Sequence, residues 1–74
     1  MNVSEIEFQN MKEAIVTELI ALTMENRNCS LQESFDLVYN SRTFKKLSNA
    51  QTGLYFQSAR YVYAFLAEEL QSSC

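Results

Sequence analysis

The first third of the chain repeats apolar residues with the period of an α-helix. Residues at spacings of three and four positions fall on one side of a helix, and five apolar residues follow that spacing here: Phe8, Met11, Ile15, Leu19 and Leu22. Ser4, with Glu7 three positions later, forms a capping-box pattern at the start. The pattern therefore predicts a long helix over about Glu5–Arg27.

A second apolar row lies on the same predicted helix, about 100–140° round its axis from the first row. It consists of Ile6, Val16, Ile20 and Met24. One apolar stripe is enough for a helix at the surface of a single domain. The second row therefore indicates that the helix is either covered on two sides by its own chain or shared with another molecule, and the sequence leaves both open.

A second, shorter helix is predicted after a break at Asn26 to Cys29. Ser30 and Glu33 form a capping box, which begins a helix over about Leu31–Tyr39. Its apolar residues are expected to form the buried face, and they are Leu31, Phe35, Val38 and Tyr39.

A third helix is predicted over about Arg42–Leu47, with Ser41 in the cap position. Within it, Phe44 and Leu47 are expected to face the core, while Lys45 and Lys46 face water. The following residues, 48–57, carry no decisive pattern, and either helical turns or an extended segment would fit them. Gly53 in this segment permits a positive φ angle.

The last helix is predicted over about Ala59–Gln71, after a capping Ser58. Its expected buried face comprises Tyr61, Val62, Phe65, Leu66 and Leu70. Glu69 falls near the middle of this apolar arc, where a carboxylate either extends to the edge of the face or needs a partner. We expect Glu69 to pair with a lysine or arginine of residues 42–46.

Composition agrees with a helical fold. The chain has 74 residues, of which 47% are hydrophobic, with no proline and a single glycine. So few turn-forming residues favour helices joined by short polar loops over a sheet. The sequence therefore predicts one all-α domain over residues 1–74, built as a small bundle of about four helices with a long first helix and a medium last one.

Charge is divided unevenly along the chain, whose formal net charge is −3. Residues 1–38 carry a net charge of −5, and residues 39–67 carry +4 from Arg42, Lys45, Lys46 and Arg60. Segments of opposite charge that pack side by side explain this division. A basic patch for an anionic partner explains it as well, and the sequence does not separate the two.

The residue types that catalysis and metal binding need are missing or badly spaced. The chain has no histidine, the commonest general base and metal ligand, and one glycine cannot build a glycine-rich phosphate loop. Cys29 and Cys74 lack the spacing of a zinc site, and Cys29 is typical of a small, half-buried apolar residue. We therefore expect no enzyme activity, no catalytic residue, no cofactor and no metal ion.

The location of the protein is expected to be cytoplasmic. The chain has no charged and then apolar leader, and its apolar runs fall far short of the ~20 residues of a membrane span. A reducing compartment with free thiols is the ordinary setting for such a chain. We expect no membrane contact.

One pattern is consistent with nucleic-acid binding. The two short helices around Asn40 and Ser41 have the outline of a helix-turn-helix over residues 31–47. Its possible anion or nucleic-acid contacts are Arg42, Lys45, Lys46 and Arg60. The net negative charge and the lack of residues that read base edges disfavour this function. It is kept as the alternative.

The chain has more apolar side chains than a domain of this size readily covers, which favours a protein-interaction module. Exposed apolar patches mark subunit or partner contacts. The candidate contact residues are Val16, Ile20, Met24, Tyr55, Phe56 and Tyr63. We expect a protein partner, in a homodimer or a small hetero-complex, although all six residues would also fit a simple core.

Several short segments from residue 30 onward resemble a family of short bacterial helical proteins of uncharacterised function. The matching pieces, which cover roughly 40 residues, are Ser41-Arg42-Thr43-Phe44, Lys46-Leu47, Thr52-Gly53-Leu54-Tyr55, Ser58, Tyr61-Val62-Tyr63 and Glu69-Leu70. The family often has proline after the capping serine, where this chain has Ala59; both residues suit a first helical position. The resemblance implies a small helical accessory that binds another protein, in a setting reminiscent of toxin–antitoxin modules.

Overall fold

The computed structural model describes residues 5–72, which fold into four α-helices and two short 3₁₀ turns with no strand among them. The elements are α1 (Glu5–Arg27), α2 (Leu31–Tyr39), α3 (Arg42–Leu47), η1 (Ala50–Thr52), η2 (Leu54–Phe56) and α4 (Ala59–Ser72). The predicted all-α bundle is confirmed, and only α4 runs past its predicted end. The predicted cap Ser4 and the terminal Cys74 lie outside the described residues.

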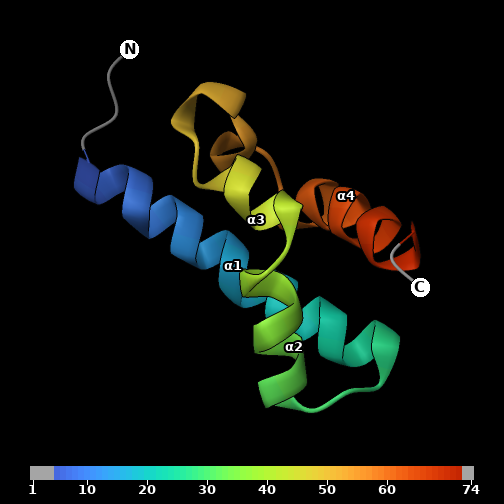
Figure 1. Ribbon diagram of the computed structural model, residues 1–74. Helices are drawn as coiled ribbons and strands as arrows, with labels where there is room; N and C mark the ends of the chain where they lie inside the picture. Colours follow the sequence, from blue (N-terminus) through green and yellow to red (C-terminus); the bar gives the residue numbers. More distant parts are fainter. Residues whose placement is uncertain (1–4, 73–74) are drawn as a thin grey trace.

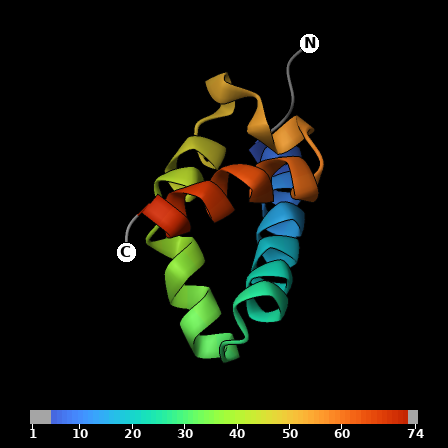
Figure 2. The same cartoon turned by 90° about the vertical axis from the view of Figure 1, so that its right-hand side faces the viewer.

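α1 and α2 form a hairpin, and α4 lies across one side of it. Figure 1 shows α1 running the length of the molecule with α2 beside its second half. Figure 2 shows α1 and α2 running in opposite directions, with α4 crossing in front of the first half of α1 and above α2. Asn28, with a φ of 52°, turns the chain between them, a conformation that asparagine tolerates. α4 packs against α1 and α3, and the side of the hairpin that faces away from α4 has no further element over it among residues 5–72.

The predicted caps form as expected. The Ser30 hydroxyl accepts a hydrogen bond from the Glu33 N–H, and the Glu33 carboxylate accepts one from the Ser30 N–H. Ser41 and Ser58 begin α3 and α4 by accepting bonds from the N–H groups of Phe44 and Tyr61. Gly53 adopts the positive φ that it alone permits freely, 71°, between the two 3₁₀ turns.

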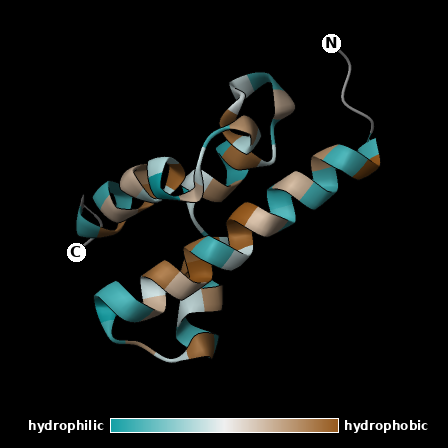
Figure 3. Cartoon of the chain, turned by 180° about the vertical axis from the view of Figure 1, so that it is seen from behind, coloured by the Kyte–Doolittle hydropathy of each residue, from teal (hydrophilic) through white to brown (hydrophobic). Residues whose placement is uncertain are grey.

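The core lies where the four helices meet, and α1 contributes more buried apolar residues to it than any other element. Its completely buried aliphatic side chains come from all four helices: Leu19, Val38, Leu47, Val62 and Leu66. Ile15, Val16 and Leu22 of α1 and Tyr55 of η2 extend it. Figure 3 shows hydrophobic and hydrophilic residues alternating along α1, as expected of a helix with one side in water.

The predicted buried face of α2 is right for Val38 and wrong for its three larger apolar residues. The structure buries Ser34 and Val38, while Leu31, Phe35 and Tyr39 are 61%, 45% and 41% exposed. The physical reason is the close contact of α2 with α1, where the Ser34 hydroxyl donates a 2.7 Å hydrogen bond to the Ile20 carbonyl oxygen. A small side chain permits that approach, so the large apolar residues of α2 lie away from α1.

The predicted buried face of α4 is wrong in part. Val62 and Leu66 are completely buried, but Tyr61 and Phe65 are 50% and 43% exposed. Tyr61 and Phe65 form an edge-to-face pair with ring centroids 5.3 Å apart. Phe65 and Glu69 are four residues apart on one side of α4, where Glu69 meets the N-terminus of α3 and the half-exposed Phe65 lines the cleft beside it.

The small contact surface of α2 is tested by a substitution at its buried serine. Ser34→Leu should lower the free energy of unfolding by about 2–3 kcal/mol, because the larger side chain forces α2 away from α1. Phe35→Ala should cost less than about 1 kcal/mol, since its ring is half in water. Chemical denaturation of both variants measures the difference, and the opposite order of the two effects would contradict the orientation of α2.

Thr23 of α1 provides a test of a second buried polar side chain. Its side chain is completely buried, and its hydroxyl has no hydrogen-bond partner among the described residues. A buried, unpaired hydroxyl lowers stability, so the similarly shaped Thr23→Val should raise the free energy of unfolding by about 1 kcal/mol. A loss of stability in denaturant melts would show that the hydroxyl is paired.

Candidate protein-contact surface

Aromatic side chains form a continuous row over the surface of α2 and α3. The Phe35 and Tyr39 rings stack with centroids 4.4 Å apart, and Tyr39 lies 4.7 Å from Phe44. Phe35 and Tyr39 are one helical turn apart on α2, and Phe44 is on α3. Three rings from two helices therefore make one surface.

The Lys12 ammonium joins this row to a second set of rings. Its Nζ atom lies 5.8 Å from the Phe44 centroid and 5.6 Å from the Phe8 centroid, within reach of a cation–π interaction with each ring. Phe8 packs edge-on against Tyr55 at 4.8 Å, and Tyr55 lies 4.3 Å from Phe56. The rings therefore continue from α2 across α3 and α1 to η2.

The uncovered face is the side of the α1–α2 hairpin opposite α4. Its exposed members are Leu31, Phe35 and Tyr39 of α2, and Phe44 of α3 is half-buried beside them. On α1, Asn26 lines a cleft with Tyr63 and Leu70 of α4. Ile20 and Met24 lie about 120° and 160° round α1 from Asn26, and they therefore belong to the uncovered face.

The six contact residues predicted from the sequence do not form one patch. Ile20 and Met24 are half-buried, with Ile20 packed against the core, and Phe56 is exposed at the far end of the aromatic row. Val16 and Tyr55 are buried in the core, where they offer little surface to a partner. Tyr63 is half-buried beside Asn26 on the α4 side of α1.

Sequence analysis missed the three largest contributors to the uncovered face, Leu31, Phe35 and Tyr39. It assigned them to the core because they are the apolar residues at helical spacing in α2. The signal that could have found them is the pair Ser34 and Val38, which are four residues apart and small. Small residues at this spacing allow two helices to pack closely, whereas large apolar residues hold the helices further apart.

The basic residues separate into two places. Arg42 and Lys46 of α3 line a shallow cleft together with Phe65 of α4, and Lys45 is exposed on the outer side of α3. Arg60 lies about 140° round α4 from Phe65, and so it points away from this cleft. Three of the four predicted nucleic-acid contacts therefore share α3, and the alternative function stays a prediction.

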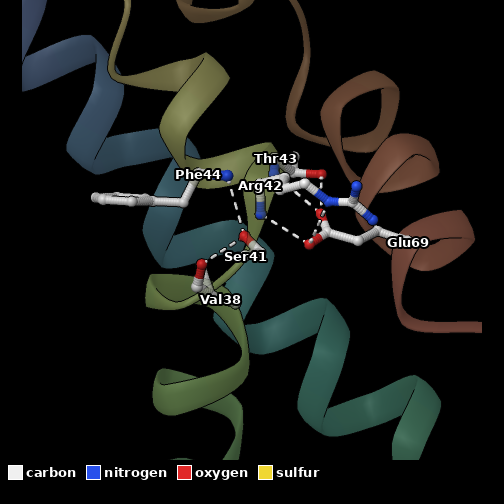
Figure 4. Close-up of polar contacts among 6 residues, drawn as sticks. All are labelled: Val38, Ser41, Arg42, Thr43, Phe44 and Glu69. Carbon is white, nitrogen blue, oxygen red and sulfur yellow. Dashed lines mark hydrogen bonds and ion pairs between the residues drawn. The ribbon is translucent and has the colours of Figure 1, made fainter. Parts of the chain in front are cut away.

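A carboxylate from α4 lies at the N-terminus of α3. The Glu69 oxygens accept hydrogen bonds from the Arg42 N–H at 2.7 Å, the Thr43 N–H at 2.9 Å and the Thr43 hydroxyl at 2.9 Å. The Arg42 guanidinium Nε lies 3.9 Å from the same carboxylate. Figure 4 shows Glu69 reaching from α4 to these groups, while the Phe44 ring points away from it.

This contact confirms the prediction that Glu69 pairs with the 42–46 segment, with one difference. The Arg42 side chain is 79% exposed and the Glu69 side chain only 16% exposed, and exposed ion pairs contribute little. The three shorter hydrogen bonds come from the N-terminal end of α3, where free N–H groups and the helix dipole favour an anion. The backbone of α3 is therefore the main partner of Glu69.

The same groups set the pKa of Glu69. Partial burial disfavours the ionised carboxylate, but the bonds from the Arg42 and Thr43 N–H groups, the Thr43 hydroxyl and the Arg42 charge together outweigh it. The pKa of Glu69 is therefore lowered from its usual value near 4.5. A carboxylate that is ionised and bonded in this way joins α4 to α3 at neutral pH.

A cleft of about 670 Å³ lies between the α1–α2 turn, α2 and the end of α4. Its lining mixes charges and apolar groups, including Arg27, Asp36 and Leu70. Cys29, half-buried in the same lining, lies with its Sγ atom 3.8 Å from the Thr23 carbonyl oxygen. Among residues 5–72, no group of three or more acidic or cysteine side chains is arranged to hold a metal ion.

The chain matches no protein-family model, no curated protein and no solved structure. The similarity to the family of short bacterial helical proteins therefore stays a prediction. Within residues 5–72, no helix combines the length and apolar character needed to cross a membrane. The uncovered face is thus the feature of the described chain that points most directly to a function.

The contact between Glu69 and α3 predicts a change in acid stability. Because folding lowers the pKa of Glu69, the stability it contributes is present above pH ~4.5 and is lost as the pH falls through the lowered value. Glu69→Gln should lower the free energy of unfolding by about 1–2 kcal/mol at pH 7. Its loss of stability between pH 7 and pH 3 should also be smaller than that of the unsubstituted chain.

Denaturant melts at a series of pH values measure this effect, with Glu18→Gln on the exposed side of α1 as the control. The pKa of Glu33 is also lowered, by the hydrogen bonds from the Ser30 N–H and hydroxyl, and both chains keep that contribution. If the free energy of unfolding of Glu69→Gln and of the unsubstituted chain changed identically with pH, the carboxylate contact would be contradicted.

Proposed function

We propose that this chain is a non-catalytic protein-interaction module that binds its partner through the uncovered face. The observation that carries the proposal is the orientation of α2, which buries a serine and a valine while Leu31, Phe35 and Tyr39 face water. Exposing large apolar side chains while smaller ones are buried is unfavourable for an isolated domain. A partner that covers the large apolar side chains removes them from water and offsets that cost.

The size of the exposed apolar stripe supports the proposal. Side chains of this size carry about 150–250 Å² each, so the fractional exposures of Leu31, Phe35 and Tyr39 leave on the order of 300 Å² of apolar surface in water. Ile20, Met24 and Phe44 extend the stripe on α1 and α3. Patches of this size on a small protein are often contact sites, and aromatic residues are enriched at such sites.

The resemblance noted in the sequence is consistent with this function. It implies a helical accessory that binds another protein in an antitoxin-like complex. The uncovered face supplies such an accessory with a helix stripe of the kind that docks against another protein. The proposal itself stands on the exposed side chains and does not depend on the resemblance.

A matched pair of substitutions tests the face. Phe35→Glu places a charge at the centre of the stripe, and Tyr61→Glu places one on an equally exposed ring of α4 on the other side of the hairpin. Both should fold, since both side chains are about half in water. Each variant and the unsubstituted chain would be immobilised on a resin and incubated with an extract of the source cell. The proteins that each resin retains, including further copies of the chain, would be identified by mass spectrometry.

The expected result is a partner that is retained by the unsubstituted chain and by Tyr61→Glu and lost with Phe35→Glu. Thermal melts followed by circular dichroism confirm that both variants keep the fold. Retention that depends on Tyr61 and not on Phe35 would place the contact on α4 and contradict the proposed face. Equal retention by all three chains would contradict it as well.

A further inference from the structure

We propose that the partner binds the uncovered face with a short protein segment that carries an aspartate or glutamate among apolar residues, and that this carboxylate pairs with Lys12. The inference rests on the proposed function and names the chemistry of the partner. It is carried by two observations, which are the surroundings of the Lys12 ammonium and the small apolar area of the face.

The Lys12 ammonium lies near two aromatic rings and has no carboxylate beside it. Its Nζ atom is 5.6 Å from the Phe8 centroid and 5.8 Å from the Phe44 centroid, and the residue is half-buried. Among residues 5–72, no carboxylate lies within ion-pair distance of this atom. The charge is therefore stabilised by the rings and by the surrounding solvent.

The ammonium borders the aromatic row that the partner has to cover. The Phe44 ring, which Lys12 approaches, has its centroid 4.7 Å from that of Tyr39. A partner that covers these two rings also removes water from the ammonium beside them. Removing water from an unpaired charge is strongly unfavourable, whereas a carboxylate that meets the charge offsets the loss. The partner therefore supplies the carboxylate that this chain lacks at Lys12.

The other charges around the row also favour an acidic partner. Lys45 is exposed about 100° round α3 from Phe44, so a second ammonium borders the same end of the row. Glu13 is exposed about 100° round α1 from Lys12. The two acids of α2 line the cleft on the α4 side of that helix, and they are Glu33 and Asp36. A carboxylate that approaches the Phe44 end of the row thus meets two positive charges, which favours its association.

The area of the face suits a short segment better than a folded domain. The exposed parts of Leu31, Phe35 and Tyr39 provide on the order of 300 Å² of apolar surface, so a partner that covers them buries roughly 600 Å² in all. Stable contacts between two folded proteins bury about 1,200–2,000 Å². A short segment can instead follow the row from Phe35 to Phe44 and place its carboxylate at Lys12.

A library of random short peptides displayed on phage tests this chemistry without a known partner. The library would be selected on the immobilised chain in reducing buffer. Peptides that bind the unsubstituted chain and not Phe35→Ala use the face, and this variant removes the ring without changing the charge. These peptides should share an aspartate or glutamate beside apolar residues. Peptides that need Phe35 and lack an acid would overturn the inference.

The same selection on Lys12→Met separates Lys12 from the other basic residues. Methionine keeps the packing beside the rings but has no charge, so the selected peptides should still need Phe35 and should lose the preference for an acid. Lys45→Met is the matched control, on which that preference should persist. Thermal melts followed by circular dichroism confirm that each variant folds. An acid preference that persists on Lys12→Met would overturn the inference.

Titration of one selected peptide measures the pair itself. Lys12→Met should weaken binding at least about tenfold, as expected when one member of a desolvated charge pair is removed. Replacing the acid of the peptide with its amide should weaken binding to the unsubstituted chain to a similar degree. It should not weaken binding to Lys12→Met, because the pair is already lost there. Independent, additive effects of the two changes would contradict a direct contact.

The inference and the proposed function fail separately. If a cellular protein is retained through Phe35 but no peptide that needs Phe35 carries an acid, the acidic segment is overturned and the protein-interaction function stands. If neither a cellular protein nor a peptide binds through Phe35, both are overturned. A dimer in sedimentation equilibrium that Phe35→Ala dissociates would show that a second copy covers the face, and it would overturn the acidic segment alone.

Discussion

The close approach of α2 to α1 is the constraint on which the rest of the structure depends. Ser34 and Val38 are small enough for the two helices to meet, and the Ser34 hydroxyl bonds directly to the backbone of α1 at Ile20. That contact fixes the rotation of α2 about its own axis. Because the helix is short, its whole apolar stripe is then directed away from the core, and the position of α3 follows from the end of α2.

A second contact, between α4 and α3, determines the other half of the molecule. α3 has only six residues, too few to be stable alone. The Glu69 carboxylate supplies acceptors for the N–H groups of Arg42 and Thr43, which have no partner within their own helix. Tyr61 and Phe65, on the same side of α4 as Glu69, stay about half in water. In both halves, a polar contact between helices decides which apolar side chains remain in water.

The sequence was sufficient to predict the helices, because their signals are local. Capping serines at Ser30, Ser41 and Ser58 and the single Gly53 determine where elements begin and turn, and each acts within three or four residues. The pairing of Glu69 with the 42–46 segment was also predictable, since a carboxylate within an apolar arc needs a partner. These features depend on neighbours along the chain or on charge alone.

The candidate face was predicted only in part, because burial depends on the distance between helices. Phe35 and Val38 are both apolar, and no local rule decides which of them meets α1. The small volume of Ser34 decides it, and that becomes clear only when α2 is placed against Ile20. Ile20 and Met24 were identified because a second row on one long helix is visible in the sequence, whereas the exposure of Leu31 and Tyr39 is a result of packing.

The position of Glu69 also has a consequence for the order in which the chain folds. The α1–α2 hairpin joins neighbouring segments, so its contacts can form as soon as residue 39 has been synthesised. The Arg42 N–H, in contrast, meets its acceptor only after the chain has grown by a further 27 residues, and contacts of longer sequence separation form more slowly. The bonds that join α3 to α4 therefore become possible only near the end of synthesis, when the α1–α2 hairpin is already complete in sequence.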